Sequence, residues 1–114
     1  MAESDWDESV VLDRKHLVGY TGGDEYLARD VLKIFLENAP LYLDTLEAAE
    51  GEGWRSSAHK LKGAARGIGA WRMARAAERA EMMGEPAADD PRRPKILGVL
   101  RERLGELAAA INSG

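Results

Sequence analysis

Apolar residues recur along this chain at helical spacing, and alternating strand-like runs are scarce. Two stripes repeat every three or four residues: Trp54, Ala58, Leu61, Ala65 and Ile68, and then Leu97, Leu100, Leu104, Leu107 and Ile111. A third stripe comprises Leu27, Val31, Ile34, Phe35, Leu43 and Leu46. Such spacing is typical of helices that bury one face. The pattern therefore predicts an all-α fold, an antiparallel up-and-down four-helix bundle.

Caps and helix breakers set the expected boundaries. Asp13 can cap a short extra N-terminal helix, and Asp24 can cap the longer helix that follows. Pro40 predicts either a kink or two abutting helices. Residues 85–95 are rich in proline and acids, which predicts a polar linker before the last helix. Residues 1–11 are acidic and weakly patterned, so we expect a flexible arm followed by one domain over residues 12–114.

Composition narrows the class of protein. The chain has 114 residues, no cysteine and a net charge of −4. A disulfide framework, a thiol nucleophile and a thiolate zinc site are thereby excluded. The acidic balance argues against nucleic acid as a partner, and no signal peptide or membrane span is visible. We therefore expect a cytoplasmic protein. We also expect a monomer, because each apolar stripe is wide enough for only one core.

Charge is distributed unevenly. Six basic residues and no acidic residue lie between residues 54 and 77: Arg55, Lys60, Lys62, Arg66, Arg72 and Arg75. The rest of the chain holds ten basic and twenty acidic residues. Such a run is often only a solvated face, but in an acidic protein it also suits a local anion or an acidic partner surface.

His59 lies within this basic segment, on a face of its own. At about 100° per residue, Lys62, Gly63 and Arg66 fall within about 60° of His59, whereas the apolar stripe lies about 100–180° away. Gly63 is unusual, because a glycine inside a helix costs about 1 kcal/mol relative to alanine. Close packing against another helix would explain it, but its position away from the core favours room for a group that approaches the imidazole. The pattern indicates an exposed, reactive histidine.

The residues around His59 resemble a family signature. Ala58-His59-Lys60-Leu61-Lys62-Gly63-Ala64-Ala65, with Gly69 ten residues after the histidine, is similar to the motif of histidine-containing phosphotransfer (HPt) domains. Glu78 falls where that family usually has a glutamate in the next helix. With flanking matches, the resemblance covers most of residues 12–111.

The resemblance implies a phosphorelay intermediate without a nucleotide site, a cofactor or a bound metal. His59 would accept a phosphoryl group from a receiver-domain aspartate of a hybrid histidine kinase and pass it to a response regulator, with magnesium supplied by the receiver. Lys62 would stabilise the phosphoryl oxygens, Arg66 and Lys60 could assist from positions near it, and Gly63 would admit the receiver. The alternative is a helical module that docks a receiver domain or kinase without accepting phosphate.

Overall fold

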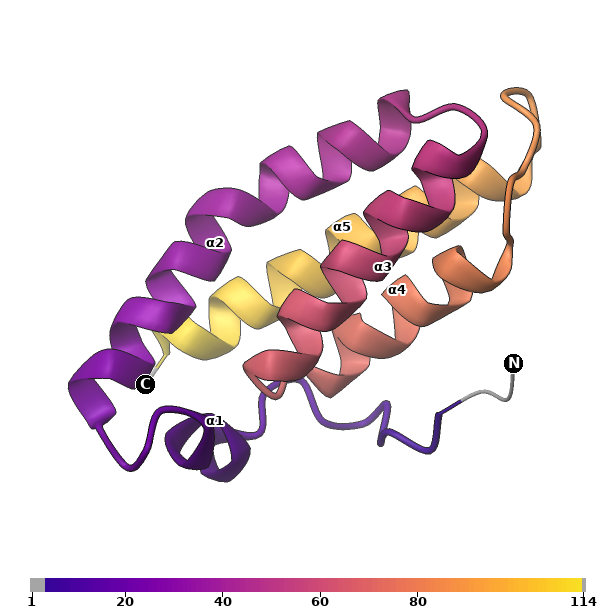
Figure 1. The fold of residues 1–114 in the computed structure, drawn as a ribbon. Coiled ribbons are helices and arrows are strands. Elements are labelled where there is room, and N and C mark those ends of the chain that lie inside the picture. Colours follow the sequence, from indigo (N-terminus) through magenta and orange to yellow (C-terminus); the bar gives the residue numbers. More distant parts are fainter. Residues whose placement is uncertain (1–3, 114) are drawn as a thin grey trace.

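The computed structural model describes residues 4–113, and these form five helices without a strand. They are α1 (Arg14–Tyr20), α2 (Glu25–Ala48), α3 (Glu52–Gly67), α4 (Trp71–Met82) and α5 (Arg92–Asn112). The four long helices lie side by side in a bundle, and α1 crosses one end of it (Figure 1). The predicted helical bundle with a short extra helix is confirmed.

The core lies between the four long helices, each of which packs against two others. Helix α3 contacts α2 and α4, and α5 closes the ring by contacting the same two helices. Trp54, Leu61 and Leu100 are completely buried at this centre. The stripe predicted for α3 is buried in full, which leaves the opposite face of α3 free for the site.

Helix α2 differs from the prediction in two respects. It is continuous through Pro40, so the alternative of two abutting helices is wrong. Pro40 has no backbone N–H to donate to the helix. Ala39 before it and Leu43 after it are completely buried, and their packing keeps the helix continuous. Leu27 and Ile34, predicted as core residues, are 45% and 55% exposed, because Ala28, Leu32 and Phe35 take the inward positions.

Helix α5 begins earlier than its apolar stripe indicates. It starts at Arg92, inside the segment predicted as a linker, and includes Pro94 in its first turn. The first turn of a helix makes no use of its backbone donors, so a proline is tolerated there. The Asp90 carboxylate accepts a hydrogen bond from the Arg92 backbone N–H at 2.9 Å and helps to begin the helix.

The described part of the predicted arm, residues 4–11, makes specific contacts with α4. Trp6 stacks on Trp71 with ring centroids 5.9 Å apart. The Arg72 backbone N–H donates to the Val10 carbonyl, and the Ser4 hydroxyl donates to the buried Glu78 carboxylate at 2.9 Å. Residues 4–11 therefore lie against α4, and the flexibility of the arm stays a prediction; residues 1–3 of the arm lie outside the described residues.

Asp13 joins α1 to the start of α4, as well as capping α1 as predicted. Its carboxylate accepts from the His16 backbone N–H and from the Trp71 indole, each at 3.0 Å. The pKa of Asp13 is lowered, chiefly by the hydrogen bond from Trp71 and then by that from His16. At the same junction Gly69 has a φ of +79°, and an added Cβ would lie 2.8 Å from the Asp13 carbonyl oxygen.

Replacing Asp13 with asparagine is expected to cost about 1 kcal/mol of unfolding free energy, because the amide can satisfy only one of the two donors. Since the folded pKa is depressed, the carboxylate stabilises the fold above its unfolded pKa and loses that effect as pH falls through the folded value. The variant should differ from the wild type at pH 7 and converge with it in acid. Urea unfolding at pH 7 and at pH values below the folded pKa of Asp13 checks this, and a difference that stays undiminished at the lowest pH would contradict it.

Candidate functional site

His59 projects from the solvent-facing side of α3, near the middle of the bundle. Its side chain is 66% exposed, whereas Ala58 and Leu61 beside it in the helix are completely buried. Gly63, one turn further on, is exposed as well, and a Cβ added there would meet nothing within 4 Å. Close packing of the glycine is therefore excluded, and the face beside the imidazole is open.

A buried carboxylate from the neighbouring helix holds the imidazole. Glu81 of α4 is only 9% exposed, and its Oε2 lies 2.6 Å from Nδ1 of His59. Its other oxygen, Oε1, accepts a hydrogen bond from the Lys62 ammonium, also at 2.6 Å. Glu81 thus joins His59 and Lys62, two residues of the α3 motif.

The ionisation of Glu81 sets the tautomer of His59. Burial raises the pKa of Glu81, but the hydrogen bonds from Lys62 and His59 together outweigh it, so the pKa lies below its usual value. The carboxylate is therefore ionised at neutral pH and can only accept hydrogen bonds. Nδ1 must then carry the imidazole proton, which leaves the lone pair of Nε2 free as a nucleophile.

The three residues predicted to stabilise phosphate differ in their surroundings. Lys62 does not stand free beside His59 as its helical position indicates; it is 12% exposed and pairs with Glu81, because α4 packs along that side of α3. Lys60 and Arg66 are exposed on α3 and do not line the hollow around His59. Their role in stabilising phosphate stays a prediction.

Sequence reasoning missed two residues of the site. Arg55 lies one turn before His59 and lines the same hollow of about 370 Å³, together with Ser56, Glu52 and Glu81. Among residues 4–113 no acidic group pairs with Arg55. The spacing of four residues from His59 could have identified Arg55. Glu81 could have been noticed as an acid on the stripe of α4 that includes Ala74 and Ala77.

Glu78, the glutamate that the family resemblance selects, does not reach the site. Its carboxylate accepts hydrogen bonds from Ser4 and Arg75 on another side of α4. Glu81 lies almost one turn further along the helix and contacts His59 instead.

An apolar depression of about 170 Å³ lies between α2 and α3 and includes Gly63. Tyr20, Ile34 and Gly67 are among the residues that line it. Tyr20 is 62% and Ile34 is 55% exposed, which is high for residues of this size and polarity. Leu27 and Leu41, seven residues before and after Ile34, are also exposed and extend the apolar surface along α2.

The described residues form neither a metal-ligand cluster nor a membrane-spanning helix. Within residues 4–113, no three acidic, histidine or cysteine side chains come together as metal ligands would. None of the helices in that range is both long and apolar enough to cross a membrane.

Comparison with known proteins identifies the family. The sequence model of the Hpt domain matches residues 30–110, a range that includes His59, Lys62, Gly63 and Glu81. No curated protein matches the chain, and no solved structure matches it either. Since the match spans well over half of the chain, this protein belongs to the Hpt domain family, the phosphotransfer modules of two-component signalling.

Proposed function

We propose that this protein is a cytoplasmic phosphorelay intermediate that accepts a phosphoryl group on Nε2 of His59 from a receiver-domain aspartate and passes it to the aspartate of a response regulator. One observation carries the proposal: an exposed imidazole whose Nδ1 is held by a buried, ionised glutamate. This arrangement directs a free lone pair outward, where another protein can reach it.

The transfer needs no proton to leave His59. The Nε2 lone pair forms a bond to phosphorus while the bond from phosphorus to the aspartyl oxygen breaks, and the electron pair of that bond leaves with the receiver carboxylate. The imidazole gains positive charge, which the Glu81 carboxylate offsets through Nδ1–H. The reverse step returns the phosphoryl group to another receiver. The chain acts as a carrier, and its receiver partners would supply the magnesium and the acidic pocket.

Two cations would stabilise the phosphoryl oxygens. Lys62 shares the partner Glu81 with His59. Arg55 faces the same hollow as His59 and has no acidic partner among residues 4–113. A guanidinium without an internal partner can bind the phosphoryl group without first breaking an ion pair, which favours Arg55 as the additional phosphate-binding residue.

Replacing Arg55 with alanine is expected to lower the phosphorylated fraction of His59 at equilibrium by about three- to tenfold, since one exposed charge-assisted contact is lost. Lys60→Ala should change it by less than about twofold, because Lys60 does not line the hollow. Lys95→Ala on α5 controls for the loss of one positive charge. Radiolabel transfer from a phosphorylated receiver domain measures all three, and a larger effect at Lys60 than at Arg55 would contradict this assignment.

The apolar depression beside Gly63 suits the docking of a receiver domain. It begins one turn from His59, and its exposed Tyr20 and Ile34 provide contact area that no residue of this chain covers among those described. Docking there would bring the receiver aspartate to Nε2 and exclude water from the reacting groups.

Gly63→Gln is expected to slow transfer by at least tenfold and to leave the unfolding midpoint within a few degrees of the wild type. The longer side chain obstructs the approach to His59, whereas nothing lies within 4 Å of its Cβ position and glutamine is the better helix former. Single-turnover transfer and thermal unfolding are the two measurements. Unchanged transfer would show that the face beside Gly63 is not used in docking.

The function itself is tested by incubating the full chain with a panel of phosphorylated receiver domains, with His59→Gln alongside. We expect an acid-labile, base-stable label on the wild type and none on the variant. If receivers bind the wild type without labelling it, the protein is a docking module that does not carry phosphate, and the proposal fails.

A further inference from the structure

One hollow of the described residues is remote from His59. It encloses about 520 Å³ where α1, the first half of α2 and the end of α5 meet. Its α2 residues, among them Leu32 and Leu36, lie about 160° around the helix from those that line the depression beside Gly63. The two surfaces therefore belong to opposite faces of α2, and the phosphotransfer site leaves this hollow without a role.

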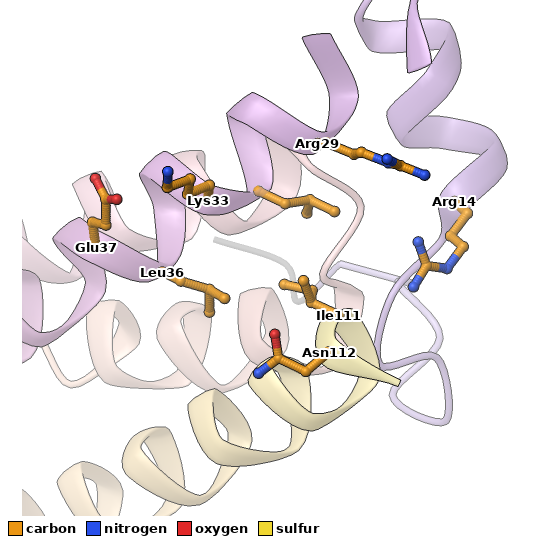
Figure 2. A pocket seen from close by; sticks show the side chains of 8 residues that line it. Arg14, Arg29, Lys33, Leu36, Glu37, Ile111 and Asn112 are labelled. Atoms are coloured by element: carbon orange, nitrogen blue, oxygen red, sulfur yellow. The ribbon is translucent and has the colours of Figure 1, made fainter. Parts of the chain in front are cut away.

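The hollow combines an apolar floor with a basic rim. Leu32 and Leu36 from α2 and Ile111 from α5 line the hollow, and so do the basic residues Arg14, Arg29 and Lys33. Figure 2 shows Arg14 and Arg29 on the same side of the hollow. Glu37 is the one acid of the lining, and Asn112 completes it. The lining thus carries a net charge of +2 in a chain whose net charge is −4.

The basic groups of the rim form no ion pair with the acids of residues 4–113. Arg14 donates to the Ala110 carbonyl at 3.0 Å, and no ion pair joins Arg14, Arg29 or Lys33 to any acid among residues 4–113. Two guanidinium groups that line one hollow repel each other. An anion between them would remove that repulsion and accept from both.

Apolar surface continues beyond the two arginines. A second hollow of about 270 Å³ between α1 and α2 shares Arg14, Arg29 and Leu32 with the first, and Leu17, Ala28 and the acid Glu25 also line it. The two arginines thus line both hollows. A ligand could place its charge at the arginines and its apolar part on the leucines.

We propose that this hollow binds a small amphipathic carboxylate, with the carboxylate between Arg14 and Arg29 and an aliphatic body on Leu32, Leu36 and Ile111. The volume lies in the range of small-molecule sites, roughly 300–1,000 Å³. A helical peptide would need apolar anchors over several turns, whereas the α2 part of this floor spans the single turn from Leu32 to Leu36. Size and charge together favour the small anion over a protein segment.

The test uses the full chain with labelled leucine and isoleucine methyl groups, titrated with decanoate below its micelle concentration and observed by NMR. Saturable shifts are expected at Leu36 and Ile111 and not at Ile34 on the opposite face. The neutral amide decanamide should bind at least tenfold more weakly. Equal binding of the two probes, or shifts that do not saturate, would overturn the proposal.

Variants locate the carboxylate. Arg29→Gln is the preferred one, because the Arg29 side chain makes no hydrogen bond among residues 4–113 whose loss could disturb the fold. It should weaken decanoate binding about fivefold or more and leave decanamide binding unchanged, while Arg66→Gln on α3 should change neither. If a peptide of alternating aspartate and leucine binds more tightly than decanoate, the hollow is a protein-docking surface and the proposal is wrong. Binding should persist in His59→Gln, so this result is independent of the phosphorelay.

Discussion

Glu81→Gln is expected to slow phosphoryl transfer to His59 by about ten- to a hundredfold. A hydrogen bond to a charged group contributes about 1.5–3 kcal/mol, and each 1.4 kcal/mol corresponds to about a factor of ten in rate. The amide no longer fixes the proton on Nδ1 of His59. In a fraction of the molecules Nε2 then carries the proton and cannot attack phosphorus. It also offers no negative charge to the phosphorylated ring. Single-turnover labelling by a phosphorylated receiver domain measures the rate.

The tautomer of His59 distinguishes a role of Glu81 in directing the imidazole lone pair from a purely structural role. The ¹⁵N chemical shifts of the imidazole should place the proton on Nδ1 in the wild type and distribute it over both nitrogens in the variant. The variant is also expected to be less stable, because Lys62 at 12% exposure loses its anion. A slow variant with the wild-type tautomer would assign the loss to packing rather than to the direction of the lone pair.

Trp54→Ala is expected to lower the free energy of unfolding by about 3–5 kcal/mol, a large fraction of the 5–15 kcal/mol typical of a domain. Trp54 is completely buried, and its indole N–H donates to the Ala80 carbonyl at 2.7 Å. The Arg93 guanidinium lies over the ring, 4.7 Å from its centroid, and would lose that contact too. Urea unfolding followed by far-ultraviolet circular dichroism gives the free energy.

Trp54→Phe separates packing from hydrogen bonding at this position. It keeps most of the aromatic surface and removes the donor to Ala80, so we expect a loss of about 1–2 kcal/mol. If the alanine variant loses no more than the phenylalanine variant, the large buried ring does not hold α3 against α4 in the way the structure indicates.

The parts of the site that lie within one helix could be predicted from the sequence. His59, Lys62 and Gly63 are neighbours along α3, so their common face follows from helical periodicity. Glu81 comes from another helix, and its approach depends on how α3 and α4 pack, which periodicity does not describe. The same packing turns Lys62 inward, whereas its position on an isolated helix indicates an exposed side chain.

Periodicity also did not determine which residues of α2 face the core. Leu27 and Ile34 have the spacing of a buried stripe, yet small and large residues one position further along, Ala28 and Phe35, face the core. Where an apolar stripe is wider than the surface it packs against, the helix can turn about its axis and still bury apolar residues. The choice depends on the neighbouring helices, and the apolar residues left outside become available to a partner.

The division of the site between α3 and α4 has a consequence for quality control in the cell. A fragment of residues 52–69 contains the complete histidine motif but lacks the carboxylate that directs the imidazole. An unfolded or misfolded chain has the same deficiency, because Glu81 meets His59 only when the two helices are packed together. Under the proposed function, incompletely folded copies would therefore accept phosphoryl groups more slowly than folded molecules.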